Sequence, residues 1–318
     1  MSQVIDISST ALKVRILSKG ATLAGVRLAD DPRNLVLGFA DPDDHASIPA
    51  FAGHLAGPVA NRVRTGRVEI DGHIHQMPLN EAGRTTLHSG PDGLHAQDWK
   101  ISEQGADYVT LTCSLPDGCN GLPGNRKLTA SYAITDSKLR LTITAISDKT
   151  TPINIASHPY WNLDGARDVS GHSLQVRAAH YLPTDSQNLP TGEQNPVAGT
   201  SYDFQNPSPV PLDPALDLNF CLGEKMRPDP VPVATLRGES GTTLSIETTC
   251  PGLQVYTGAN LPDLSVAMAD CPQVAPYSGI ALEPQHWPDA LHHAHFPDIM
   301  IQPGDSYRQI TDYLLTKS

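Results

Sequence analysis

Residues 139–144, Leu139-Arg-Leu-Thr-Ile-Thr144, alternate apolar and polar side chains without a break. Successive side chains of a β-strand point to opposite faces, so this period of two predicts a strand with one buried face. The same alternation occurs near the start of the chain, where Leu12, Val14 and Ile16 are separated by charged side chains. Two such stretches far apart in the sequence favour a fold built from strands.

Further short apolar or alternating runs extend this pattern over the rest of the chain. They predict strands at 22–28, 66–70, 73–77, 109–113, 127–134, 152–157, 172–177, 244–246, 252–257, 279–283, 298–302 and 306–315. The one helix expected is short, near 42–49. Strands without alternating helices favour antiparallel sheets, hence an all-β fold of the sandwich or barrel kind. The proline-rich segment 206–214 is expected to be an ordered surface loop, and 1–318 a single domain.

Composition narrows the class of protein further. The 318 residues carry a net charge of −12, which argues against a nucleic-acid partner, because such a partner needs clustered Lys and Arg. No run approaches the roughly 20 apolar residues of a membrane span, and the N-terminus lacks the pattern of a signal peptide. We therefore expect a cytoplasmic protein that does not associate with membranes. The five cysteines show no C-x-x-C spacing and are expected to be free, buried thiols.

The first candidate for chemistry is the stretch 278–289, SGIALEPQHWPD, in which an apolar strand runs into Glu283. Pro284 is expected to stop this strand and to place Glu283 at the rim of a sheet. A carboxylate at the end of a buried strand is costly unless it is solvated, paired or used in a reaction. The alternative interpretation is a solvated glutamate at a strand end.

The second candidate is 151–163, TPINIASHPYWNL, where a strand ends at His158. Histidine titrates near neutrality and can act as a general acid or base. The adjacent Tyr160, Trp161 and Asn162 are typical of sugar clefts, in which rings stack on C–H faces and amides bind hydroxyls. The alternative is a structural histidine bonded to a backbone carbonyl.

Other candidates are weaker when taken singly. Arg62 offers several fixed hydrogen-bond donors, and His88 precedes a Ser-Gly turn, but taken singly each is more often a surface or turn-supporting residue. The histidines of the segment 286–295 lack regular ligand spacing, so no metal is expected. We find no nucleotide-binding loop and no nucleophile elbow.

The ordered set of motifs resembles the aldose 1-epimerase (galactose mutarotase) family. The motifs are GPVANRV (57–63), TTLHSG (85–90), DG…GLPG (117–124), DKTTPINIASHPYWNLDG (148–165), AHYLPTDSQNLPTGEQNPVAGTSYDF (179–204), LDLNF (216–220), GLQVYTG (252–258), GIALEPQHWPDA (279–290), FPDIMIQPGDSY (296–307) and a closing ITDYLL. The resemblance implies a large antiparallel β-sandwich with a cleft across one sheet. It also implies a monosaccharide partner without metal or cofactor, and it leaves monomer and homodimer open.

The resemblance also implies roles for individual residues. Glu283 matches the family's general base and His158 its general acid. The remaining matches are His88, Arg62 and Asp217, which hold the ring oxygen and hydroxyls, and Asn61 and Gln254, which lie near the cleft. Since an acid and a base are placed side by side, we expect both Glu283 and His158 to be charged before substrate binds.

The implied reaction interconverts the α and β anomers of a free aldose by ring opening and closure. Two alternatives stay open: a hexose-6-phosphate 1-epimerase, which needs extra Arg or Lys for the phosphate, and a non-catalytic carbohydrate-binding module on the same scaffold. The motifs depart from the family at 57–59 (GPV) and 217–218, where Asp-Leu replaces the usual Asp-His. The preferred aldose therefore stays open among hexoses, pentoses and deoxy sugars.

Overall fold

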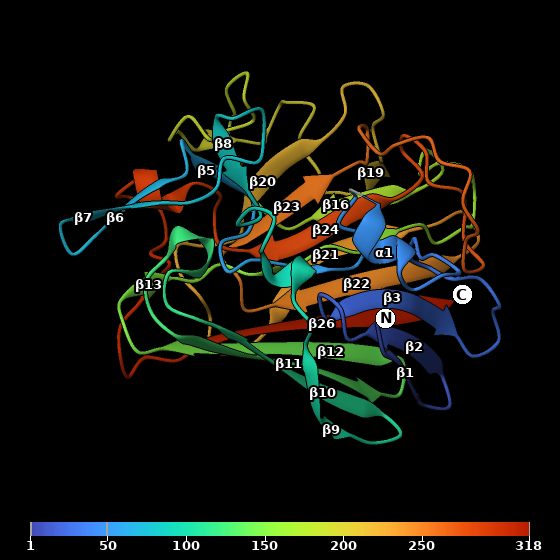
Figure 1. The fold of residues 1–318 in the computed structure, drawn as a ribbon. Coiled ribbons are helices and arrows are strands. Elements are labelled where there is room, and N and C mark those ends of the chain that lie inside the picture. The colour runs from blue at the N-terminus through green and yellow to red at the C-terminus, as the bar shows by residue number, and fades with distance from the viewer. Residues whose placement is uncertain (1, 49, 318) are drawn as a thin grey trace.

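Two large antiparallel sheets form the body of the computed structural model, which describes residues 2–48 and 50–317 (Figure 1). Within these ranges the larger sheet has nine strands. In spatial order they are β19 (Ser208–Pro209), β16 (Ser173–Val176), β21 (Val231–Arg237), β22 (Thr242–Thr248), β26 (Tyr307–Lys317), β12 (Lys138–Ser147), β11 (Arg126–Thr135), β10 (Tyr108–Leu115) and β9 (Lys100–Gln104).

The second large sheet has six strands and lies over the first in Figure 1. Its order is β15 (Tyr160–Trp161), β24 (Ile280–Gln285), β23 (Gly252–Tyr256), β20 (Asp217–Cys221), β17 (His180–Tyr181) and β18 (Asn195–Pro196). A three-stranded sheet comprises β1 (Val4–Ser8), β2 (Leu12–Leu17) and β3 (Thr22–Leu28). Four short pairs complete the fold: β4 (Leu55–Ala56) with β14 (Ala156–Ser157), β5 (Arg62–Arg64) with β8 (Thr85–Leu87), β6 (Arg67–Ile70) with β7 (His73–Gln76), and β13 (Thr151–Pro152) with β25 (Met300–Ile301).

Helices are few and short in the described ranges: α1 (Asp44–Ser47), η1 (Leu94–Ala96), η2 (Cys119–Gly121) and η3 (Ala290–His292). The helix expected near 42–49 is present as the single turn α1, and position 49 lies outside the described residues. None of these helices is long and apolar enough to cross a membrane.

The main hydrophobic core receives side chains from the inner faces of both large sheets. Alternation along β12 places Leu139, Leu141 and Ile143 in this core, and Leu282 of β24 and Val255 of β23 meet them from the other sheet. Burying each such side chain contributes about 1.5–3 kcal/mol relative to an exposed position. The all-β, antiparallel sandwich expected from the sequence is confirmed.

Two of the expected strands are shorter than the sequence predicts. The stretch 152–157 is not one strand, because its two ends pair with different partners: β13 with β25 and β14 with β4. Between them Asn154 turns its side chain to the backbone of His286, accepting from its N–H at 2.9 Å. Likewise, 298–302 forms only the two-residue strand β25.

The six-stranded sheet has one face for the core and one for a polar cavity. Ile280 and Leu282 point into the main core, whereas the next residue, Glu283, points to the opposite face. On β23 the same alternation separates Val255 in the core from Gln254 on the cavity side. The alternation along β23 and β24 therefore directs one set of side chains into the core and the other set into the cavity.

Candidate active site

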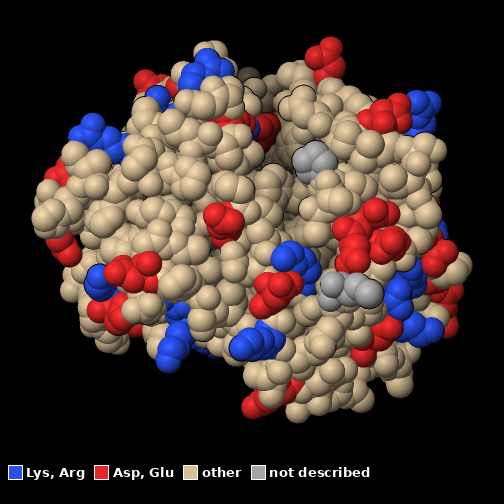
Figure 2. Space-filling view, viewed as in Figure 1, with Lys and Arg blue, Asp and Glu red and all other residues tan. Residues whose placement is uncertain are grey.

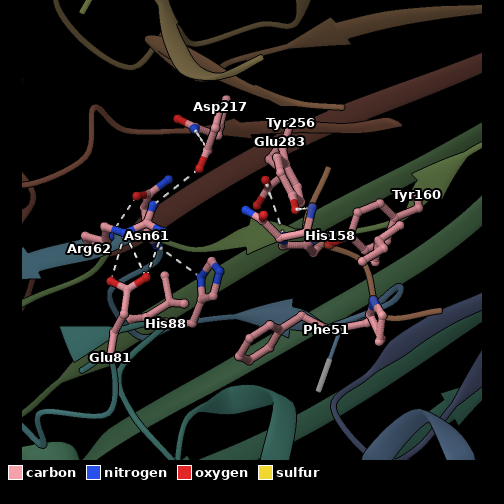
Figure 3. Close-up of a pocket in the computed structure, with 16 residues that line it drawn as sticks. Phe51, Asn61, Arg62, Glu81, His88, His158, Tyr160, Asp217, Tyr256 and Glu283 are labelled. Carbon is pink, nitrogen blue, oxygen red and sulfur yellow. Dashed lines mark hydrogen bonds and ion pairs between the residues drawn. The ribbon is translucent and has the colours of Figure 1, made fainter. Parts of the chain in front are cut away.

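A cavity of about 230 Å³ opens on the outer face of the six-stranded sheet (Figure 3). All seven residues proposed from the sequence line it: Asn61, Arg62, His88, His158, Asp217, Gln254 and Glu283. They come from two sources. Asp217, Gln254 and Glu283 stand on neighbouring strands β20, β23 and β24, and the others come from the loops and short strands that fold over this face.

Glu283 lies inside strand β24 and is only 2% exposed. The expectation that Pro284 ends the strand and leaves Glu283 at a rim is wrong, since Glu283 pairs with Gln254 and Pro284 pairs with Leu253. The carbonyl of Pro284 points away from β23 and accepts from Gln309 Nε2 at 3.0 Å. Its missing N–H falls on that same side, where β15 has already ended, so no ladder bond is lost.

His158 faces Glu283 across the floor of the cavity, with Nε2 3.5 Å from Oε1 (Figure 3). Burial raises the pKa of Glu283 well above its usual range and lowers that of His158 to about 4. The expected charged pair is therefore wrong, because both shifts favour the neutral forms. Among the described residues, no hydrogen bond reaches Glu283 Oε2 or His158 Nδ1. A buried carboxyl oxygen without a partner is suited to a ligand hydroxyl.

The neutral and the charged forms of this pair hold the same number of protons. A carboxylic acid beside a neutral imidazole becomes a carboxylate beside an imidazolium when one proton moves from Glu283 to His158. The 3.5 Å gap is slightly longer than a hydrogen bond, as is common in unliganded acid–base sites. The pair can thus supply a base and an acid together without exchanging protons with solvent.

His88 is held as a neutral hydrogen-bond donor. Its Nδ1 accepts from the backbone N–H of Asn61 at 3.1 Å, so the proton of the neutral ring lies on Nε2. Burial, followed by the neighbouring His158, lowers the pKa of His88 well below its ordinary value. Both His88 and Asn61 adopt positive φ angles, 50° and 60°, in the left-handed region that Asn and His enter more readily than most residues.

Arg62 joins the loops to the sheet through a chain of polar contacts. Its Nε and Nη2 donate to Glu81 at 2.8 Å each, and its Nη1 lies 3.7 Å from Asp217 Oδ2. Asp217 also accepts from Gln254 Nε2 at 2.8 Å. The oxygen of the same amide, Gln254 Oε1, has no hydrogen-bond partner within 2–48 and 50–317. It is a second buried acceptor facing the cavity.

Aromatic side chains form the apolar part of the lining. Tyr160 lines the cavity as expected, with its ring 4.9 Å from that of His158. The same expectation is wrong for Trp161, which alternates into the core against Tyr313. It is also wrong for Asn162, whose amide donates to backbone carbonyls away from the cavity.

Sequence reasoning missed several lining residues. They are Ala50, Phe51, Glu81, Leu87, Tyr256, Asn260, Leu261 and Pro262. Tyr256 carried a usable signal, since it stands two positions after Gln254 on the same strand and must share its face. Phe51 and Glu81 lie in loops, where no periodic pattern reports which way a side chain points.

The histidines of 286–295 lie outside this cavity. His292 Nδ1 donates to Asp289 Oδ1 at 2.7 Å, and the same oxygen accepts from the backbone N–H of Arg64 at 2.9 Å. This contact ties the loop after β24 to the strand β5 that carries Arg62. In the described part of the chain no group of three or more His, Cys, Asp or Glu side chains is arranged to hold a metal ion.

Comparisons with known proteins agree with this architecture. The sequence model of the family described as aldose 1-epimerase matches residues 3–314. Galactose mutarotase from Rattus norvegicus is 32% identical over 321 residues, which cover 96% of this chain and 92% of the relative. Aldose 1-epimerase from Escherichia coli (strain K12) is 32% identical over 323 residues, with the same coverage.

Solved structures give the same result. An aldose epimerase homologue from C. elegans superposes with a TM-score of 0.91 at 28% identity, covering 100% of this chain and 99% of that one. The galactose 1-epimerase from Lactobacillus acidophilus NCFM gives a TM-score of 0.82 at 27% identity, with 100% and 99% coverage. The fold is therefore that of the galactose mutarotase-like β-sandwiches. The chain belongs to the aldose 1-epimerase family, which is a family of isomerases.

Proposed function

We propose that this protein interconverts the α and β anomers of a free aldose, with Glu283 as general base and His158 as general acid. The observation that carries the proposal is the Glu283–His158 pair, 3.5 Å apart on the floor of a cavity in a family of epimerases. Opening a cyclic hemiacetal requires a base at the O1 hydroxyl and an acid at the ring oxygen, the two oxygens bonded to C1.

Ring opening moves two protons. The carboxylate of Glu283 takes the proton of the O1 hydroxyl, the imidazolium of His158 gives its proton to the ring oxygen, and the bond from C1 to the ring oxygen breaks. The product is an open-chain aldehyde beside a neutral acid and a neutral imidazole. Rotation about C1–C2 and the reverse transfers then close the ring on the other face.

Burial favours the state of the pair that accompanies the open chain. The raised pKa of Glu283 and the lowered pKa of His158 both stabilise the neutral forms. A carboxylate with a raised pKa is also a stronger base once it is ionised. Each assisted proton transfer accelerates the reaction by about 10²–10⁴-fold.

The other lining residues suit a polyhydroxylated ring. His88 Nε2–H and the Nη1 of Arg62 are donors, and Asp217 and Gln254 Oε1 are acceptors. The ring of Tyr160 offers an apolar face for the C–H groups of the sugar. Donors near the ring oxygen stabilise charge that develops there as the ring opens.

A phosphorylated substrate is less well supported. Among the described residues that line the cavity, Arg62 is the only Lys or Arg, and its guanidinium is already paired with Glu81. A pure binding module would have no need of the buried Glu283–His158 pair, whose burial is costly. A free monosaccharide is therefore the proposed substrate, and the preferred aldose is left to experiment.

Other expectations from the sequence belong to this proposal. A single domain is supported by one core cluster that takes residues from Ile5 to Leu315. A partner other than nucleic acid is supported by Figure 2, in which basic side chains on the visible face are scattered among acidic ones. Location in the cytoplasm without membrane association, and a monomeric or homodimeric state, stay predictions that cell fractionation and sedimentation test.

The test is polarimetry on a panel of freshly dissolved single anomers of hexoses, pentoses, deoxy sugars and hexose 6-phosphates. We expect the purified protein to accelerate the approach to equilibrium for at least one free aldose. Acceleration confined to hexose 6-phosphates would replace the proposal by the phosphate-specific alternative. Saturable binding of a free aldose without any acceleration would leave only a binding module.

A further inference from the structure

Glu81 stands at a rigid turn beside the cavity. It is the first residue of the turn 81–84 between β7 and β8. Its backbone N–H donates to the Thr85 carbonyl at 3.2 Å, and its carbonyl accepts from the Arg84 N–H at 3.0 Å. The side chain leaves this turn towards Arg62 and lines the cavity (Figure 3). The backbone therefore fixes where the carboxylate can lie.

The carboxylate of Glu81 occupies one edge of the guanidinium of Arg62. Two parallel bonds join them, Nε to Oε2 and Nη2 to Oε1, both at 2.8 Å, and Thr85 Oγ1 donates to Oε2 at 2.7 Å. Burial opposes ionisation of Glu81, but the bonds from Arg62 and Thr85 outweigh it and lower its pKa. Glu81 is thus a carboxylate at neutral pH.

This pairing leaves little of Arg62 for a charged ligand. Arginine recognises a phosphate or a carboxylate with two parallel N–H groups, and the edge formed by Nε and Nη2 is taken. The remaining nitrogen, Nη1, lies 3.7 Å from the carboxylate of Asp217. The guanidinium of Arg62 is therefore flanked by the carboxylate of Glu81 and by the buried carboxyl group of Asp217, whose pKa is raised by burial. His88 and His158 have pKa values lowered towards the neutral form.

We propose that Glu81 is a specificity-determining positioning residue, which restricts the cavity to uncharged aldoses and excludes uronic acids and sugar phosphates. It acts in two ways: it occupies the anion-binding edge of Arg62, and it adds a negative charge to the wall of the cavity. This inference rests on the proposed function. Hydrogen bonds to a charged partner change affinities by about tenfold to a hundredfold, so removal of Glu81 should change selectivity on that scale.

The test compares three substrates, D-glucose, D-glucuronate and D-glucose 6-phosphate, by anomer-exchange NMR with wild type and Glu81→Gln. The glutamine keeps the shape of the side chain and removes its charge. We expect the ratio of kcat/KM for each anionic sugar to that for D-glucose to rise by about tenfold to a hundredfold. Glu69→Gln, which removes the same charge from an exposed position on β6, is the matched control and should leave the ratio unchanged.

The outcomes are distinct. A ratio that stays within about twofold of wild type while D-glucose is still turned over overturns the role of Glu81. If wild type accelerates none of the free aldoses in the polarimetry panel described above, it is the proposed function that fails. Should Glu81→Gln not fold, Glu81→Asp serves: its shorter side chain releases one of the two bonds to Arg62, and the same ratio should still rise, with an unchanged ratio counting against the proposal.

Discussion

His158 Nε2 and Glu283 Oε1 lie 3.5 Å apart, although His158 belongs to the connection between β14 and β15 and Glu283 to the interior of β24. His158 and Glu283 are 5% and 2% exposed, so neither side chain is solvated as a surface acid or base would be. Their shared burial, rather than their mutual attraction, determines their protonation.

Replacement of Glu283 by Gln should lower kcat by about 10²–10⁴-fold, because the change keeps the shape of the side chain and removes the base. Sugar binding should persist and can be followed by NMR titration, while polarimetry gives the rate. Glu247→Gln on β22, away from the cavity, is the control. A mutant rate close to wild type would remove Glu283 from the mechanism.

His158→Asn should also lower kcat by about 10²–10⁴-fold, since asparagine can donate a hydrogen bond but cannot deliver a proton to the ring oxygen. The loss should extend over the whole accessible pH range in anomer-exchange NMR. His73→Asn changes an exposed ring on β7 and should behave as wild type. Retained turnover at any pH would contradict the assignment of His158 as the acid.

The pH profile of kcat/KM should be a broad plateau. The active pair holds one proton, which it keeps from the lowered pKa of His158, about 4, up to the raised pKa of Glu283. Activity should fall below about pH 4, where the pair takes up a second proton, and again above the raised pKa of Glu283, where the pair loses its only proton. An acidic limb near 6.5, the ordinary value of histidine, would show that His158 is not desolvated.

Arg62→Ala should raise KM by about tenfold to a hundredfold with a smaller effect on kcat, because it removes a charged donor to sugar hydroxyls and leaves Glu81 and Asp217 without their cation. Steady-state kinetics over a wide range of sugar concentration separates the two constants. Arg62→Lys keeps the charge but not the two-bond fork, so its KM should lie between those of wild type and the alanine variant. Unchanged KM and kcat together would argue against contact between Arg62 and the sugar.

The folded state should lose stability as pH falls from about 6.5 to 4. Burial lowers the pKa of His45 to about 4 and that of His54 to about 3, so the unfolded chain takes up protons near 6.5 that the folded chain refuses until lower pH. Between its folded and unfolded pKa values, each such histidine lowers the free energy of unfolding by about 1.4 kcal/mol per pH unit as the pH falls. Urea unfolding at several pH values should show a slope lower by about that amount in His54→Gln, and an unaltered slope would contradict this.

Much of the fold could be predicted because alternation records burial directly. Leu139, Leu141 and Ile143 alternate in the sequence because they alternate between core and surface in β12, and no tertiary information is needed to see it. The break within 152–157 could not be predicted, since it depends on which distant strands, β4 and β25, pair with its two ends. The same holds for Pro284, whose place inside β24 depends on where β15 ends.

The candidate site divides in a similar way. The residues that line the cavity and match family motifs could be named from the sequence, but their protonation could not, because it follows from burial under loops that carry no pattern. Glu81 could not be found either. Its partnership with Arg62 depends on the direction in which a turn releases one side chain, which only the coordinates give.

The two-faced six-stranded sheet also bears on how the protein could be altered by design. Because the cavity side of β23 uses positions such as Tyr256 and the core side uses positions such as Val255, variation at every second position would reshape the sugar site while leaving the apolar interior intact. A library confined to Gln254 and Tyr256 should yield new sugar preferences in variants whose melting temperatures stay near that of the parent. The cavity-facing positions of the strand are thus open to selection for substrate, and the core-facing positions to selection for stability.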